Sequence, residues 1–122
     1  ISTTKVMFVN FGEKEAMRSL QIIGELRKAG ISAELFPSSD KMKKQMGYAN
    51  NKAIPFVAII GEQEITDGTV ALKNMTTGEQ KSVTAEELKE LLEELNELLE
   101  APKLLEEDLE AFSLFLDIVF AG

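Results

Sequence analysis

The side chains that most often carry enzyme chemistry are missing from this sequence, which contains no Cys and no His. Without Cys there is no thiolate nucleophile, no disulfide and no Cys-based zinc site. Without His the commonest general base near neutral pH is absent. Paired carboxylates remain, because the chain has 21 Asp and Glu residues, but acids on solvated helices are mostly surface groups. We therefore predict no enzyme, no catalytic residue, no metal site and no cofactor.

Charge is distributed unevenly along the 122 residues. Residues 1–83 carry 11 Lys or Arg and 9 Asp or Glu, a net charge of +2, whereas residues 84–122 carry 2 and 12, a net charge of −10. Leu and Glu supply 21 of those last 39 residues, a composition that is common in designed helices. An acidic tail opposes binding to a polyanion unless it points away from the basic part of the chain.

An alternation of strands and helices is expected to position the charged and polar side chains of the chain. Apolar or alternating runs predict strands at residues 5–9, 31–36, 54–60, 68–74 and 80–83. Helices are predicted at residues 13–29, about 40–51, from 84 to about 101, and about 103–120. The first three strands should pair in parallel, and the last two should form a hairpin. We predict an α/β fold: a mixed five-stranded sheet, with a parallel core plus one antiparallel hairpin, flanked by helices and followed by an extra C-terminal helix.

Three local patterns sharpen this expectation. The helix at residues 13–29 has an apolar stripe that should face the core, made of Ala16, Leu20, Ile23 and Leu26. Ser39 or Asp40 is expected to cap the next helix. Thr84-Ala-Glu-Glu87 is a capping box that opens the third helix.

The last predicted helix is apolar over about two-thirds of its circumference, more than the ~100° stripe of a helix with one buried face. Three interpretations stay open: the helix is wedged into the core, it presents a protein-binding face, or it drives homodimerisation. The aromatic anchors favour binding. The residues predicted to bind protein are Leu109, Phe112, Phe115, Leu116, Val119 and Phe120.

Most of the chain, about residues 3–93, resembles the anticodon-binding domain of class II aminoacyl-tRNA synthetases, and that of histidyl-tRNA synthetases most. The combined string of motifs is specific, although each piece alone would be weak. The motifs are Val9-Asn-Phe-Gly12, Leu26-Arg-Lys-Ala-Gly-Ile31, Lys43-Lys-Gln-Met46, Tyr48-Ala49, Ile54-Pro-Phe-Val57, Ile60-Gly-Glu62 with Glu64, Gly68-Thr-Val70 and Lys73-Asn-Met-Thr-Thr-Gly-Glu-Gln80.

The resemblance implies a non-catalytic fold that grips a tRNA anticodon stem-loop. Lys would meet phosphates, aromatic rings would stack on bases, and Glu or Gln would read a base edge. The RNA-binding residues that it implies are Asn10, Phe11, Lys43, Lys44, Gln45, Tyr48, Gly61 and Glu62. Structural roles compete for several of them: a solvated helix face for the lysines, a lid on the core for Phe11, ring packing for Tyr48 and a turn for Gly61.

Two hypotheses of function follow. In the first, residues 1–96 are an anticodon-binding-like domain that serves as an engineered, cytoplasmic scaffold, and residues 97–122 are an appended amphipathic helix that binds a protein partner or a second copy. In the second, the chain is a tRNA anticodon-binding module. No membrane span or signal peptide is expected, and the start without Met suggests a fragment or a trimmed tag.

Overall fold

The structure is a computed structural model that describes residues 4–100 and 106–121, with side chains at 4–98 and 113–120. Ten elements follow one another in this part of the chain: β1 (Val6–Phe8), α1 (Glu13–Lys28), β2 (Ala33–Leu35), α2 (Met42–Asn51), β3 (Phe56–Ile59), α3 (Glu62–Asp67), β4 (Thr69–Asn74), β5 (Gln80–Thr84), α4 (Ala85–Glu100) and α5 (Glu106–Ala121). None of these helices is long and apolar enough to span a membrane.

The strands form one five-stranded sheet in the order β2-β1-β3-β4-β5. β1 pairs in parallel with both β2 and β3, whereas β3–β4 and β4–β5 are antiparallel. The mixed sheet with a parallel core and one hairpin is therefore confirmed. The apolar runs form strands because side chains in a strand alternate between two faces, and both faces of β1 and β3 are covered by helices.

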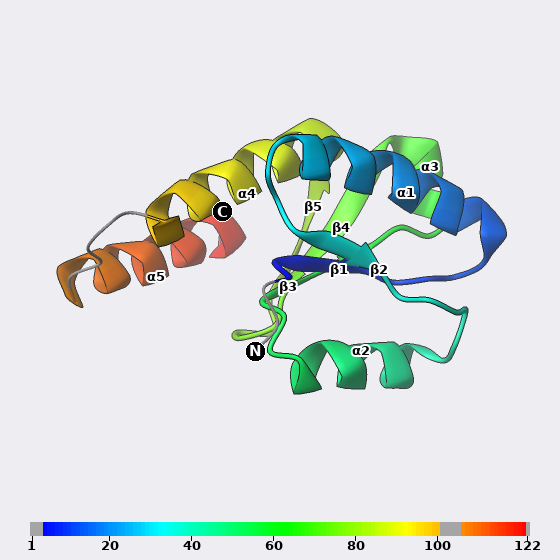
Figure 1. Ribbon diagram of the computed structural model, residues 1–122, viewed down its shortest axis with the longest axis horizontal. Coiled ribbons are helices and arrows are strands. Elements are labelled where there is room, and N and C mark those ends of the chain that lie inside the picture. The colour runs from blue at the N-terminus through cyan, green and yellow to red at the C-terminus, as the bar shows by residue number, and fades with distance from the viewer. Residues whose placement is uncertain (1–3, 101–105, 122) are drawn as a thin grey trace.

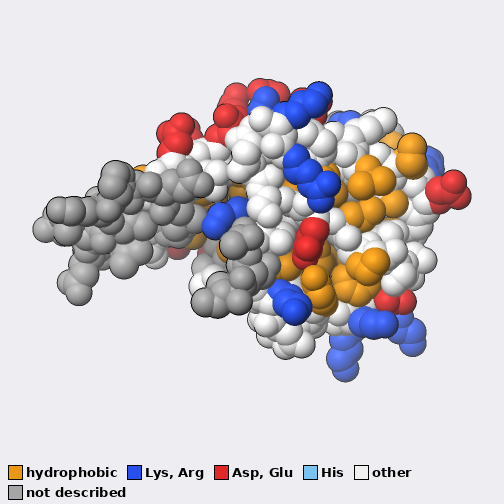
Figure 2. Space-filling view, viewed as in Figure 1, with side chains coloured by type: hydrophobic (Ala, Val, Ile, Leu, Met, Phe, Trp, Pro, Cys, Tyr) orange, Lys and Arg blue, Asp and Glu red, His pale blue; other side chains and the backbone are white. Residues whose placement is uncertain are grey.

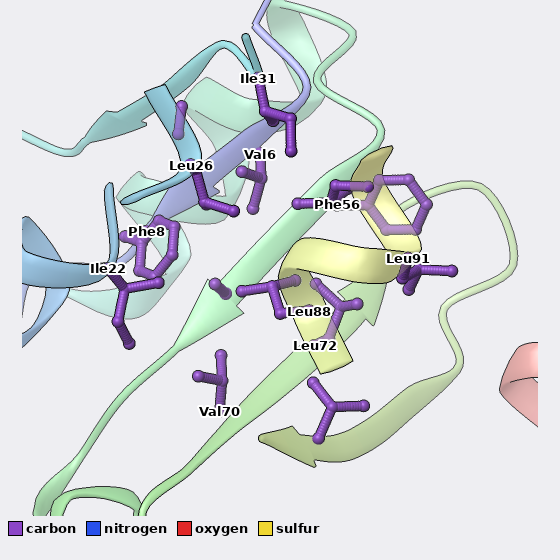
Figure 3. Close-up of a cluster of buried hydrophobic side chains, with 14 of the residues drawn as sticks. Val6, Phe8, Ile22, Leu26, Ile31, Phe56, Val70, Leu72, Leu88 and Leu91 are labelled. Carbon is purple, nitrogen blue, oxygen red and sulfur yellow. The ribbon is translucent and has the colours of Figure 1, made fainter. Parts of the chain in front are cut away.

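Helices cover the two faces unequally (Figure 1). α1, α3 and α4 lie on one face, where the larger core gathers alternate strand residues such as Val6, Phe8 and Leu72 with Leu26 and Leu88 (Figure 3). α2 lies alone on the other face, packed on a smaller cluster that includes Met7, Val9 and Val57. Successive residues of β1 thus enter different cores, as the two-residue period of a strand requires.

Two local expectations are corrected. Leu20, predicted to face the core, is 48% exposed, because α1 buries the next positions around the helix instead: Ser19, Ile22, Ile23 and Leu26. Neither Ser39 nor Asp40 caps α2, whose N-cap is Lys41 without a side-chain hydrogen bond. The hydroxyl of Ser38 donates to Asp40 at 2.8 Å instead, and that carboxylate pairs with Lys44 at 3.1 Å.

The capping box that opens α4 is confirmed by two reciprocal hydrogen bonds. The backbone N–H of Thr84 donates to Glu87 Oε1 at 2.8 Å, and the backbone N–H of Glu87 donates to Thr84 Oγ1 at 3.1 Å. The α4 stripe is buried at Leu88, Leu91, Leu92 and Leu95, but Leu98 is exposed.

α5 returns along α4 and reaches the sheet with its last turns (Figure 1). Phe120 is buried, and its ring stacks on Phe56 with centroids 5.8 Å apart and planes at 14°. Lys81 Nζ donates to the carbonyl of Val119 at 2.8 Å. Phe115, Leu116 and Val119 pack beside the larger core. The inward face of α5 is therefore part of the core, as the first of the three interpretations of this helix expects.

Candidate nucleic-acid interface

The loops that follow β1, β2 and β3 meet at one edge of the sheet, because parallel strands end on the same side (Figure 1). The chain leaves β1 for β2 on one side and returns to β3 on the other, so the strand order reverses between β1 and β3. At such a switch point the loops diverge and leave a crevice, which is the usual ligand site of open α/β sheets. Phe11 follows β1 and Gly61 follows β3, so both lie at this crevice.

Asn10 and Gln45 are buried at this edge and join its loops through hydrogen bonds. The backbone N–H of Asn10 donates to Gln45 Oε1 at 2.7 Å, and Gln45 Nε2 donates to the carbonyls of Asn10 and Asp40, both at 2.8 Å. Asn10 Nδ2 donates to the Phe36 carbonyl at 3.0 Å, and its Oδ1 accepts from the N–H of Gly12 at 2.9 Å. The loops after β1 and β2 and the start of α2 are therefore tied into one unit.

This network changes what Gln45 and Asn10 can do. Gln45 is 0% exposed and Asn10 is also buried, so their amides serve the loops rather than an open surface. The resemblance implies that Gln45 meets RNA directly, but the structure places its amide where a base edge cannot reach it. Sequence spacing could not show this, because the two residues are 35 positions apart.

Phe11 and Gly61 are brought together at the open side of the crevice. The Phe11 side chain is 41% exposed, and a Cβ added to Gly61 would lie 3.8 Å from Phe11 Cε2 and 3.1 Å from Glu64 Oε1. The N–H of Gly61 donates to that same carboxylate at 2.7 Å, which caps α3. Glycine thus lets the ring and the carboxylate approach the backbone, and Phe11 remains partly exposed beside it.

α2 brings exposed positive charge to this edge with its first turn. Lys43 and Lys44 are both exposed, and α2 has no acid in its first turn. The pKa of the Asp40 carboxyl is lowered from its ordinary value, first by the hydrogen bond from Ser38 and then by Lys44. Lys43 has no ion-pair partner within the described residues, so its charge is free to meet a phosphate.

Tyr48 lies further along α2 than the other predicted residues, about 9 Å from the first residue of the helix, Met42, at 1.5 Å per residue. Its ring packs edge-on against Phe36, with centroids 5.5 Å apart. The negative charge of Glu34, with burial, raises the pKa of the Tyr48 hydroxyl. The structure therefore gathers Asn10, Phe11, Gln45, Gly61, Glu62 and the start of α2 at one edge, and sets Tyr48 beside β2.

Sequence reasoning missed two features, one at this edge and one on a face of the sheet. One is α3, which forms where only a turn was predicted after strand three, and which places Glu62 and Glu64 in its first turn. The other is a polar strip on the α2 face of the sheet, because α2 packs on β1 and β3 and the smaller core includes no residue of β4 or β5. Lys73, Gln80 and Ser82 lie on this strip by register. The alternation at residues 69–74 was the available signal.

The two ends of the charge distribution differ, although α1 carries both signs. Lys and Arg side chains gather over α2 in Figure 2, whereas Asp and Glu side chains gather over α4. α4 and α5 extend from the edge opposite to the crevice (Figure 1). Among the described residues no group of three or more acids stands close enough to hold a metal ion.

Comparison with known proteins accounts for most of the chain. A family model described as "Anticodon binding domain" matches residues 5–95. The histidine–tRNA ligase of Phocaeicola vulgatus is 58% identical over 84 residues, which are 69% of this chain and 18% of that protein. α5 lies beyond the residues that the family model matches.

Two solved structures are similar in fold and, at lower identity, in sequence. The histidyl-tRNA synthetase of Nostoc sp. PCC 7120 has a TM-score of 0.72 and 27% identity over 76% of this chain and 22% of that one. The apo histidyl-tRNA synthetase of S. aureus has a TM-score of 0.68 and 29% identity over 74% of this chain and 23% of that one. The chain therefore spans about a fifth of the length of these relatives.

Proposed function

This chain belongs to the anticodon binding domain family, and from that premise we propose that it binds the anticodon stem-loop of a tRNA at the edge where β1, β2 and β3 end. The observation that supports this most is the joint position of Phe11, Gly61 and the basic start of α2 around one crevice. An exposed aromatic ring and exposed ammonium groups, of which Lys43 has no ion-pair partner within the described residues, are suited to an unpaired RNA loop.

Each group has a distinct part in the proposed contact. The exposed face of Phe11 stacks on an unpaired base, which contributes roughly 1–3 kcal/mol per base. Lys43 and Lys44 meet phosphates as point charges. Glu62, exposed in the first turn of α3, accepts hydrogen bonds from a base edge. Asn10 and Gln45 act indirectly, because they fix the loop that carries Phe11.

The acidic tail is compatible with this proposal because of where it lies. Its net charge of −10 would oppose a polyanion at short range. α4 and α5 extend from the opposite edge of the sheet (Figure 1), and charge effects between solvated groups fall off over ~8 Å at physiological salt. The charges of α4 and α5 therefore oppose phosphate binding at the basic start of α2 only weakly.

The relatives suggest which tRNA and which reaction are involved. They are named histidine–tRNA ligases, so we infer that the bound RNA is a histidine tRNA. The chain spans about a fifth of such a protein and lacks His and Cys. We infer that the chain itself holds the RNA without catalysis, and that the ligase chemistry belongs to the remainder of the larger proteins.

The test is binding of a histidine-tRNA anticodon stem-loop to the whole chain, measured over a series of salt concentrations. We expect binding that weakens steeply with salt, as phosphate contacts require. A stem-loop with a scrambled loop of equal length and charge should bind less tightly, because stacking and base-edge contacts are lost. Absence of binding at low salt would refute the proposal, and equal affinity for both loops would reduce it to general RNA binding.

A second candidate function rests on the outward face of α5. Leu114 and Ile118, one turn apart, are 60% and 64% exposed. Of the six residues predicted to bind protein, four pack inward and Leu109 and Phe112 lie outside the described side chains. In this second proposal a protein partner or a second copy contacts Leu114 and Ile118. Solution mass of the chain with Ile118→Glu, compared with the unchanged chain, tests self-association through this face.

We keep the division into residues 1–96 and an appended helix at 97–122 as part of this second proposal. The family match ends at residue 95, which supports an addition after that point. α4 nevertheless runs through residue 96 without interruption, so the two parts share a helix. The engineered, cytoplasmic scaffold remains a prediction, and the comparisons support the RNA-binding hypothesis better.

A further inference from the structure

We propose that a cavity between α4, α5 and the edge of the sheet remote from the crevice binds a small amphipathic carboxylate, with its apolar body inside and its charge at Lys5. The cavity has a volume of about 220 Å³. It is lined by residues that precede β1 and β3, by the end of β4, and by α4 and α5. It is therefore separate from the proposed RNA surface, and this inference does not depend on RNA binding.

The interior of the cavity is apolar, and its wall is packed into the larger core. Phe56, Leu92 and Leu95 are all buried, and Leu116 of α5 adds to the wall from the opposite side. The Phe56 ring is fixed by its stacking on Phe120. Such a wall offers dispersion contacts and gives a bound apolar group a dry environment.

Two polar residues of the cavity, Lys5 and Asn74, favour an anion, whereas the Nδ2 of a third, Asn96, already donates to the Gly30 carbonyl at 3.3 Å. Lys5 is the one charged residue among those that line it, and its ammonium has no ion-pair partner within the described residues. Asn74 is buried, and its Oδ1 accepts from the N–H of Thr76 at 2.9 Å. That bond commits the oxygen to the turn, so the remaining amide group is a donor. An ammonium and an amide donor beside an apolar wall match a carboxylate with a hydrocarbon body.

The volume sets the size of the ligand. An engineered apolar cavity of about 150 Å³ accommodates benzene, which has six carbon atoms. At the same ratio this cavity holds roughly nine heavy atoms. Octanoate is close to this size when its carboxylate lies at the opening. It also has an uncharged counterpart, octan-1-ol, that keeps the hydrocarbon body and removes the charge.

The experiment titrates the whole chain with octanoate and, separately, with octan-1-ol, below the concentrations at which either aggregates. The readout is the NMR shift of the methyl groups of Leu92, Leu95 and Leu116. We expect saturable shifts with octanoate at an affinity roughly tenfold higher than with octan-1-ol, since a charge-assisted hydrogen bond separates the two. The methyl groups of Leu114 and Ile118, exposed on α5 and absent from the cavity, should not follow the same curve.

Two matched variants test the part of Lys5. Lys5→Met keeps the hydrocarbon stem and should reduce octanoate affinity roughly to that of octan-1-ol. Lys14→Met, at an exposed position of α1, removes the same charge and should leave both affinities unchanged. Shifts that do not saturate, or equal affinities of the unchanged chain for the two probes, would overturn the proposal. The comparison of octanoate with octan-1-ol uses the unchanged chain alone, so it tests the proposal even if the Lys5→Met chain does not fold.

Discussion

Gln45 and Asn10 form a closed pair in which side chain and backbone exchange two hydrogen bonds, N–H to Oε1 at 2.7 Å and Nε2 to carbonyl at 2.8 Å. The pair joins the first turn of α2 to the loop after β1, so the position of Phe11 depends on the buried Gln45 through the neighbouring Asn10. We expect Gln45→Ala to lower the free energy of unfolding by about 2–4 kcal/mol, because two buried backbone groups lose their partners.

This first prediction is checked by urea denaturation, with Gln63→Ala as the control. Gln63 is exposed on α3 and bonds only Asp67 at 2.8 Å, so its loss should change stability by less than about 0.5 kcal/mol. A Gln45→Ala chain as stable as the control would show that water replaces the amide. If Gln45 positions Phe11, the same variant should also weaken stem-loop binding under conditions where the chain is still folded.

The second prediction separates the two faces of α5. Phe120→Ala should cost about 3 kcal/mol of unfolding free energy, because its buried ring stacks on Phe56. Ile118→Ala, two positions away and 64% exposed, should cost less than about 0.5 kcal/mol. Denaturant midpoints of the two variants give the answer. Similar small losses would mean that α5 does not contribute to the core.

A third prediction concerns Ser19, whose buried hydroxyl has no hydrogen-bond partner among the described residues. Ser19→Ala removes an unsatisfied group and improves helix propensity, so it should raise the unfolding free energy by about 1 kcal/mol. Ser113→Ala, at an exposed position of α5, gains the propensity alone and is the matched control. The outcome that contradicts this reading is a larger gain at Ser113 than at Ser19, measured as a difference in thermal midpoint.

The fourth prediction is a pH dependence at the capping box of α4. Hydrogen bonds from Thr84, first from its backbone, lower the pKa of Glu87 below its ordinary value of 4.5. Between the folded pKa and 4.5 the unfolded chain holds more protons, so this carboxylate stabilises the fold above that range and the effect is lost as pH falls through it. We expect the thermal midpoint to exceed that of Glu87→Gln at pH 6 and the gap to narrow below pH 4.5.

Glu86→Gln is the control for this fourth experiment, since it removes a neighbouring acid that is not part of the box. Its thermal midpoint should follow that of the unchanged chain more closely over the same titration. A gap at Glu87→Gln that stays constant from pH 6 to pH 3 would mean that the charge of the carboxylate does not stabilise the box.

The fifth prediction concerns the salt dependence of RNA binding. Each phosphate contact that is lost should reduce the slope of log affinity against log salt by roughly 0.7 for a single strand. Lys43→Gln with Lys44→Gln should therefore flatten the slope by roughly 1.4. Lys28→Gln, exposed and paired with Glu25 at the far end of α1, is the control for a lysine outside the site, and it removes one positive charge where the double variant removes two. If the unchanged chain and the double variant had equal slopes, the phosphates would not contact Lys43 and Lys44.

Much of this fold could be predicted from the sequence, because the signals that specify its strands and helices lie within single elements. Residues 54–60 and 5–9 are nearly uninterrupted apolar runs, and such runs are stable only as strands covered on both faces. The box at Thr84 and Glu87 is a local signal, because both partners lie within one helical turn. The stripe of α1 was misplaced at Leu20 because the true core face includes Ser19, a polar residue that hydrophobic periodicity does not select.

The candidate site was less accessible, because its contacts join distant residues. The resemblance supplied residue types, but it could not distinguish a residue that meets RNA from one that supports it. Phe11 and Gly61 are 50 positions apart, and Asn10 and Gln45 are 35 apart. Only the parallel pairing of β1 with β3 brings the first pair together, and only the docking of α2 buries Gln45.

Composition and periodicity by themselves determined three properties of this chain: an α/β sheet, a catalytic repertoire without Cys or His, and an acidic, Leu-rich end. These depend on residue type and on spacing within one element. The tertiary structure decided which exposed groups share a surface, that the inward face of α5 completes a core through Phe120, and that α4 and α5 extend from the edge of the sheet opposite to the crevice. Those outcomes depend on packing between elements, where the free energy of burial outweighs local preference.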